Sequence, residues 1–116
     1  MKKEFRFVEL IAIDYKHRIE VPERYRGIIR ETEAKWVMVP VRDRKMSLDV
    51  MTESAFQALK EDKSKDAVTI LGDPHPLVID SHGRMTLPKE IRRYFPQNRA
   101  RFVGTGDYFC IDPISQ

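Results

Sequence analysis

Short apolar runs separated by polar turns make up most of the chain, and they predict strands more than helices. Residues 10–13 and 77–79 are apolar runs, and a polar turn follows each of them. Residues 18–21 and 84–87 then alternate polar and apolar side chains, which is the period of a strand with one buried face. The pattern therefore predicts a strand–turn–strand unit in each half of the chain.

A proline follows each alternating segment and predicts the start of a short helix. Pro22 and Pro88 have a fixed φ and no N–H donor, and both properties suit the first position of a helix. Gly27 and Pro96 are expected to close these helices within about two turns. Each half of the chain therefore continues from its strands into a short helix.

The remaining apolar runs predict further strands and one helix between the two halves. Strands are expected at residues 36–39, 48–50, 101–103 and 108–111. Thr52 can cap a helix with an apolar stripe of Ala55, Phe56 and Leu59, and the charged stretch 60–66 follows it. Residues 67–71 fit a helical turn or a short strand equally well.

The two strand–turn–strand units are copies of one sequence. Residues 13–26 match residues 79–92, and residues 34–37 match residues 100–103, all at the same offset of 66 residues. The identical pairs include Asp14 and Asp80, Arg18 and Arg84, Pro22 and Pro88, and Arg26 and Arg92. Two copies are too few for a solenoid, so we expect one pseudo-twofold domain in which each half completes the core of the other. It comprises residues 1–116, with a first repeat at 7–50, a helical linker at 51–72 and a second repeat at 73–116.

Composition places the chain among soluble intracellular proteins. With 116 residues it can form one ordinary domain, and its regular apolar runs argue against disorder despite a charged fraction of 34%. A single cysteine, Cys110, excludes an internal disulfide and a cysteine metal cluster. The apolar run near the N-terminus is too short for a membrane segment. We therefore expect a cytoplasmic protein without a membrane partner.

Basic charge is concentrated in the two repeats. Residues 14–30 hold five Lys or Arg against three acids, and residues 80–101 hold six against two, whereas the whole chain has a net charge of only +3. Segregated positive charge is typical of a surface that binds a polyanion, because each Lys or Arg at a phosphate releases counterions. A solvated basic surface without a ligand is the alternative.

The duplicated motif resembles the paired Asp-x-x-x-Arg signature of the MraZ family. It is Asp-x-Lys-x-Arg-Ile-x-Val-Pro in the first copy and Asp-x-x-Gly-Arg-Met-x-Leu-Pro in the second, and Phe102-Val103-Gly104-Thr105-Gly106 resembles the second-repeat strand and turn of that family. The resemblance implies a β-rich α+β fold, an AbrB-like swapped-hairpin (double-split) β-barrel formed by two internal repeats with short helices.

The resemblance also implies a function. Members of the family regulate the division and cell-wall gene cluster, assemble into a ring and turn their Asp-x-x-x-Arg loops toward DNA. By this resemblance Arg18 and Arg84 contact double-stranded DNA, with Lys16 and His82 beside them. It implies a nucleoid-associated homo-oligomer without a cofactor.

Position 17 departs from the family pattern. Asp14, Asp80 and Gly83 are expected to structure the loops, because aspartate accepts turn amides and glycine allows a positive φ. His17 stands where the second copy has Gly83. A positive φ strains a residue with a side chain, so we expect the first loop to be shaped differently from the second.

Other functions fit the residues less well. Arg18 and Arg84 could simply brace Asp14 and Asp80, and an exposed pair of that kind contributes only about 0–1 kcal/mol. The two aspartates lack the neighbours of a catalytic carboxylate pair, so no enzyme activity is expected. The three histidines are His17, His75 and His82, and their spacing does not suit a metal site.

An AbrB-like antitoxin or protein-interaction module is the alternative function. An antitoxin usually has a long tail that wraps its toxin, whereas residues 112–116 follow almost directly on the last expected strand. The sequence therefore favours the DNA-binding regulator.

Overall fold

The computed structural model describes residues 4–42, 46–61, 69–70, 73–96 and 98–114. Its elements are, in chain order, β1 (Val8–Ala12), β2 (Arg18–Glu20), α1 (Glu23–Glu31), β3 (Trp36–Arg42), β4 (Met46–Thr52), α2 (Glu53–Glu61), β5 (Thr69–Ile70), β6 (His75–Pro76), β7 (Arg84–Thr86), the 3-10 helix η1 (Lys89–Tyr94), β8 (Arg99–Gly104) and β9 (Phe109–Pro113). The strand-rich α+β fold expected from the sequence is confirmed.

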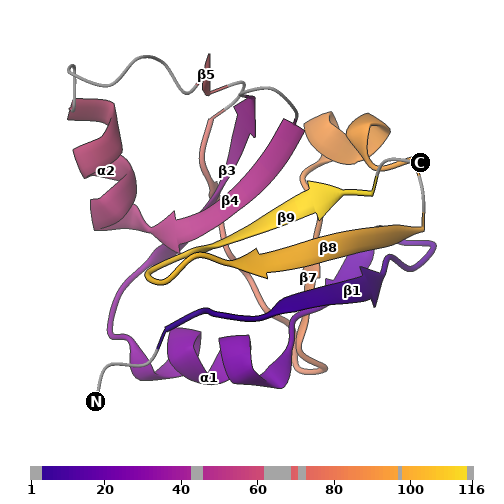
Figure 1. Ribbon diagram of the computed structural model, residues 1–116, viewed down its shortest axis with the longest axis horizontal. Helices are drawn as coiled ribbons and strands as arrows, with labels where there is room; N and C mark the ends of the chain where they lie inside the picture. The colour runs from indigo at the N-terminus through magenta and orange to yellow at the C-terminus, as the bar shows by residue number, and fades with distance from the viewer. Residues whose placement is uncertain (1–3, 43–45, 62–68, 71–72, 97, 115–116) are drawn as a thin grey trace.

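Two sheets organise the described residues (Figure 1). The larger one has the strand order β1-β8-β9-β4-β3-β5, and β6 also pairs with β3. Its ladder does not close on itself, since β1 and β5 lie at its two ends. The smaller sheet is an antiparallel ribbon of β2 and β7, so one strand of each repeat pairs with its counterpart in the other.

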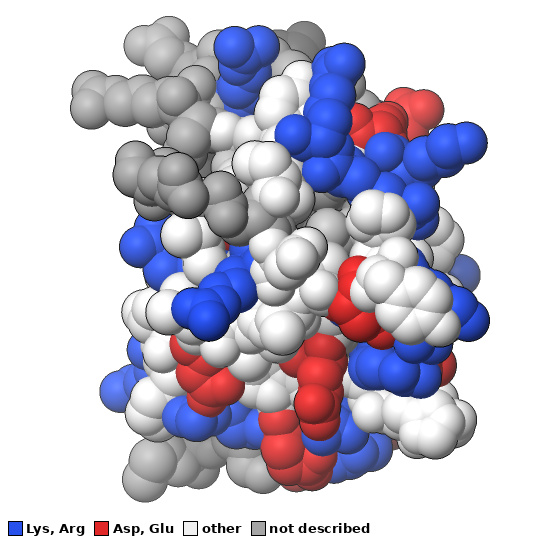
Figure 2. Space-filling model, turned by 90° about the vertical axis from the view of Figure 1, so that its right-hand side faces the viewer, with Lys and Arg blue, Asp and Glu red and all other residues white. Residues whose placement is uncertain are grey.

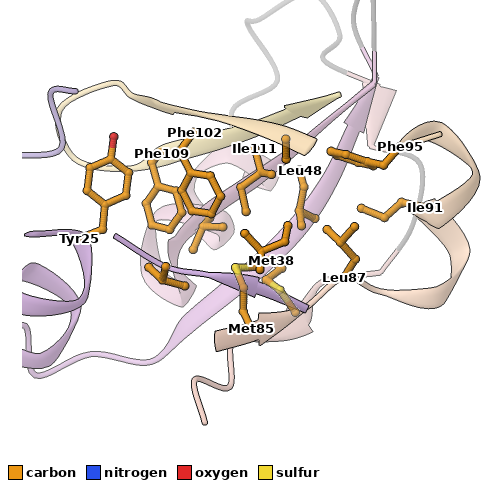
Figure 3. Packing of buried hydrophobic residues seen from close by; sticks show 14 of the residues in the cluster. Tyr25, Met38, Leu48, Met85, Leu87, Ile91, Phe95, Phe102, Phe109 and Ile111 are labelled. Atoms are coloured by element: carbon orange, nitrogen blue, oxygen red, sulfur yellow. The ribbon is translucent and has the colours of Figure 1, made fainter. Parts of the chain in front are cut away.

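Side chains from both repeats fill one core (Figure 3). The fully buried ones include Ile19, Val21, Leu48, Val50, Met85, Leu87, Phe102, Phe109 and Ile111. Phe5 packs edge-on against Tyr25 of α1, with ring centroids 5.0 Å apart at an angle of 83°. Trp36 and Phe102, which are equivalent in the two repeats, are both buried. Burial of this apolar surface is the main force that holds the halves together.

Helix α2 packs on the face of the larger sheet that is turned away from this core. Phe56 of this helix packs with Val39, Val41 and Met51 in a second, smaller cluster. The Oγ1 atom of Thr52 accepts a hydrogen bond from the Ala55 amide at 3.2 Å, as expected of a helix cap. Among the described residues, no helix is long and apolar enough to cross a membrane.

Two boundaries differ from the sequence prediction. Gly27 does not close α1, because the helix continues to Glu31 and Thr32 ends it by donating its N–H and its hydroxyl to the Ile28 carbonyl. The strand expected at 77–79 is absent, and β6 lies just before it. Pro76 has no N–H to donate, which limits this ladder to a short stretch.

Two expectations fall partly among residues whose structure is not described. The charged stretch 60–66 lies mostly outside the described residues. Of residues 67–71, Thr69–Ile70 form β5 opposite the end of β3, which favours the strand over the helical turn.

Candidate nucleic-acid interface

The first Asp-x-x-x-Arg segment forms a tight turn around one carboxylate. The Oδ1 atom of Asp14 accepts hydrogen bonds from the amides of Lys16 and Arg18, both at 2.9 Å. Its Oδ2 atom accepts one from the Arg18 Nε atom at 2.7 Å. The Asp14 amide donates to the Arg18 carbonyl at 3.0 Å, and the His17 amide donates to the Asp14 carbonyl at 2.9 Å. Asp14 therefore fixes both the backbone of the turn and the arginine stem.

The second segment repeats these bonds 66 residues later. The Oδ1 atom of Asp80 accepts the amides of His82 and Arg84 at 2.8 and 2.9 Å. The Arg84 Nε atom donates to Oδ2 at the longer distance of 3.4 Å. The Asp80 amide donates to the Arg84 carbonyl and the Gly83 amide donates to the Asp80 carbonyl, both at 2.9 Å. The two loops have the same hydrogen-bond pattern.

The expectation that position 17 would give the first loop another shape is wrong. His17 has a φ of 62° and Gly83 a φ of 79°, so both residues adopt the left-handed conformation. His17 is exposed, and its side chain therefore finds room outside the turn. The hydrogen bonds of the turn hold the backbone there, and histidine tolerates this conformation better than bulky or branched residues do.

The β2/β7 ribbon connects the two loops. Arg18 lies opposite Thr86, and Glu20 lies opposite Arg84. The Ile19 and Met85 side chains between them point inward and are fully buried. Since side chains alternate along a strand, Arg18 and Arg84 belong to the outward face of the ribbon. Their side chains are 24% and 29% exposed.

Backbone bonds tie each loop to the other repeat. The Val21 amide donates to the Gly83 carbonyl, and the Leu87 amide donates to the His17 carbonyl, both at 2.9 Å. These two bonds are related by the same offset as the loops themselves. Neither loop is therefore held by its own repeat alone.

The remaining residues expected at DNA lie at the tips of these loops. Lys16 is exposed, with its Nζ atom 5.6 Å from the centre of the Tyr15 ring. His82 is exposed at the equivalent position of the second loop. The third histidine, His75, lies elsewhere and pairs with Glu90 of η1.

Both loop aspartates ionise more readily than usual. Burial opposes ionisation of Asp14, but hydrogen bonds from the Arg18 amide, the Arg18 guanidinium and the Lys16 amide outweigh it, so the pKa of Asp14 is lowered. The Arg84 amide is the main cause that lowers the pKa of Asp80, and the His82 amide and the charge of Arg84 add to it against a smaller effect of burial. The loops therefore contain ionised aspartates near neutral pH.

On the side of the molecule drawn in Figure 2, surface charge alone does not outline an interface. Figure 2 shows the side of the molecule that lies at the right of Figure 1, and there Lys and Arg side chains spread from top to bottom with Asp and Glu side chains among them.

Sequence reasoning did not assign a role to Arg26 and Arg92, which bond to the backbone just after β2 and β7. The Nε atom of Arg26 donates to the Val21 carbonyl at 3.0 Å, and that of Arg92 donates to the Leu87 carbonyl at 3.1 Å. Arg26 also packs against Gly83 of the second loop. Arg26 and Arg92 are identical residues at the repeat offset, and this identity was the signal in the sequence. The contact of Arg26 with Gly83 of the other repeat is seen only in the fold.

Comparison with known proteins identifies a relative of this chain. No protein-family model matches the chain. A transcriptional regulator MraZ from Desulforapulum autotrophicum is 32% identical to it, in an alignment that covers 92% of this chain and 78% of that protein. The resemblance inferred from the duplicated motif is confirmed. The chain belongs to the MraZ family of transcriptional regulators.

Proposed function

We propose that the chain is a transcriptional regulator that binds double-stranded DNA through its two Asp-x-x-x-Arg loops. The observation that carries this proposal is the duplication of one hydrogen-bonded turn at both ends of a single ribbon. That arrangement presents Arg18 and Arg84 on one outward face.

Each arginine is braced and still able to bind a ligand. Asp14 and Asp80 engage the Nε atoms of Arg18 and Arg84, and among the described residues no acceptor engages their terminal Nη atoms. Guanidinium Nη groups bind phosphate oxygens and the O6 and N7 atoms of guanine. Bracing and DNA contact are therefore compatible, because they use different atoms of one side chain.

Lys16 and His82 extend the two contact sites, and both are exposed next to the arginines along the chain. From the family resemblance we infer that the protein acts on the nucleoid in the cytoplasm and that it regulates the division and cell-wall gene cluster.

Binding to the region upstream of the chain's own gene tests this function. Fluorescence anisotropy would compare that duplex with one of equal length and shuffled sequence over a series of salt concentrations. The proposal expects tighter binding to the upstream duplex and affinity that falls as salt rises. Absence of binding to both duplexes at low salt would overturn it.

We also propose self-association into a homo-oligomer, with a ring as the form that the family resemblance implies. Strand β1 lies at one end of the larger sheet, and such edges tend to be covered by another chain. Val8 and Leu10 on this strand are 62% and 60% exposed, and the neighbouring Phe7 is 52% exposed. Light scattering of the wild type and of Leu10→Glu tests this, since a monomer mass for the wild type at high concentration contradicts it.

A further inference from the structure

The outward face of the β2/β7 ribbon is not the same at its two ends. Glu20 lies opposite Arg84, whereas Thr86 lies opposite Arg18. Glu20 and Thr86 are equivalent positions of the two repeats, so the ribbon has one arginine beside a carboxylate and one beside a hydroxyl. The motif that the two loops share leaves positions 20 and 86 unspecified, so it does not show this difference.

The register brings Glu20 close to Arg84. The bonds between positions 21 and 83 and between positions 87 and 17 mark the hydrogen-bonded pairs of the ribbon. Since such pairs alternate with pairs that share no backbone bond, Glu20 and Arg84 form a pair of the second kind. Cα atoms in these pairs are about 4.5 Å apart and their side chains are neighbours.

The Glu20 carboxylate is available to a ligand. Glu20 is exposed, and the side chain before it, Ile19, is fully buried on the other face of the ribbon. Arg84, which lies opposite Glu20 across the ribbon, uses its Nε atom for Asp80. Among the described residues, no donor is hydrogen-bonded to the Glu20 carboxylate.

A carboxylate on a DNA-binding face acts differently from an arginine. It repels phosphates, and in the major groove it accepts a hydrogen bond from an exocyclic amino group, that of cytosine or that of adenine. Arginine donates to guanine in the same groove, and a two-stranded ribbon is narrow enough to enter it. Arg84 and Glu20 together thus offer a donor and an acceptor side by side, which matches the pattern of a G·C pair.

We propose that Glu20 is a specificity-determining residue, which accepts a hydrogen bond from a cytosine amino group beside the Arg84 contact and weakens binding to DNA of other sequence. This inference rests on the proposed function. This role differs from that of the basic residues Arg18 and Arg84, which attract DNA. Thr86, at the equivalent position, has no charge with which to discriminate in this way.

Two substitutions at Glu20 test the inference. Glu20→Thr gives position 20 the residue found at position 86, and Glu20→Gln removes the charge while it keeps the size. Glu61→Gln is the matched control, because it removes one exposed negative charge at the end of α2, on another element. Each variant would be titrated with the upstream duplex and with the shuffled duplex of equal length, at one salt concentration.

Glu20→Thr and Glu20→Gln should tighten binding to the shuffled duplex and lower the ratio of the two affinities by roughly fivefold or more, the range of one base contact. Glu61→Gln should leave that ratio unchanged. Melting temperatures equal to that of the wild type would show that the variants fold.

The failure of this inference differs from the failure of the proposed function. If the wild type prefers the upstream duplex and both Glu20 variants keep the same ratio, Glu20 does not discriminate and only this inference is overturned. A wild type that binds both duplexes equally overturns it as well, while DNA binding stands. A wild type that binds neither duplex overturns the proposed function and this inference together.

Discussion

The guanidinium of Arg26 lies against the backbone of Gly83, although the two residues belong to different repeats. A Cβ atom on Gly83 would be 2.3 Å from the Nη1 atom of Arg26. The Arg26 side chain is not free to move away, because its Nε atom donates to the Val21 carbonyl and its Nη2 atom lies 2.8 Å from the Glu23 carboxylate. The helix of the first repeat therefore supports the loop of the second.

Gly83→Ala should destabilise the protein more than Gly106→Ala does. Both glycines have a positive φ, of 79° and 96°, so both variants strain the backbone by about 1 kcal/mol or more. Only at Gly83 does the new Cβ meet another side chain, since nothing lies within 4 Å at Gly106. We expect Gly83→Ala to cost about 1–2 kcal/mol beyond the control in urea unfolding. Equal destabilisation by the two substitutions would show that the Arg26 side chain moves aside at no cost in free energy.

Removing Arg26 should relieve part of that extra cost. The double variant Arg26→Ala with Gly83→Ala retains the strained φ but has no clash. A double-mutant cycle should therefore give a coupling free energy of roughly 0.5–2 kcal/mol, in the sense that the second change costs less when the first is present. Additive free energies of unfolding would contradict the contact.

Gly27, unlike Gly83, should accept an alanine. It lies inside α1, and a Cβ at this position would have no neighbour within 4 Å. Since glycine in a helix is about 0.5–1 kcal/mol less favourable than alanine, Gly27→Ala should stabilise the chain by that amount. A higher urea midpoint with an unchanged slope would be the measured result, and a lower midpoint would contradict it.

The sequence allowed the repeat and its local geometry to be predicted, but not the contacts between the repeats. Alternation at residues 18–21 and 84–87 predicts which side chains are buried, because that pattern is a local property of a strand. The prediction that Gly27 ends α1 was wrong because the backbone amides after it continue to form helical hydrogen bonds.

The contacts between repeats were not predicted, for a different reason. The contact of Arg26 with Gly83 joins residues 57 positions apart along the chain. Only the pairing of β2 with β7 brings them together. His17 was also misjudged, because the hydrogen bonds of the turn decide its φ more than the residue type does.

Arg18→Ala and Arg84→Ala should each weaken DNA binding. If the arginines contact phosphate, the plot of log affinity against log salt should become flatter by about one unit for each lost contact. Arg42→Ala is the control, since Arg42 is an exposed arginine at the end of β3, away from the ribbon. A lower melting temperature with unchanged DNA affinity of the folded protein would show that the two arginines only brace their loops.

The loop aspartates should make stability depend on acid pH. Their pKa values are lowered in the folded protein from an ordinary value of 3.8, so the stability they contribute is fully present above that value and is lost as pH falls through the lower folded pKa. The melting-temperature difference between the wild type and the Asp14→Asn, Asp80→Asn variant should be largest near about pH 7 and shrink below about pH 4. A constant difference across this range would contradict the role of ionisation.

Asp49 should have the opposite pH dependence. It lies on β4, where its Oδ1 atom accepts a hydrogen bond from the Ser47 hydroxyl at 2.9 Å. Burial raises the pKa of Asp49, and the nearby charge of Asp112 raises it further, although hydrogen bonds from Cys110 and Ser47 oppose this. A carboxyl with a raised folded pKa stabilises the fold below its ordinary value of 3.8, and this contribution is lost as pH rises through the folded pKa.

Replacing Asp49 by Asn should therefore stabilise the protein at neutral pH. The amide keeps an oxygen that can accept the Ser47 hydroxyl, and it has no charge to be buried near Asp112. We expect the melting temperature to rise by roughly 2–5 °C near about pH 7. The gain should vanish as pH falls toward the ordinary value of 3.8, because the carboxyl with its raised pKa is then already protonated in the folded protein. Asp73→Asn removes an exposed carboxylate and serves as the control. A gain from Asp49→Asn of equal size at both pH values would mean that packing or hydrogen bonding, and not the buried charge, is the cause.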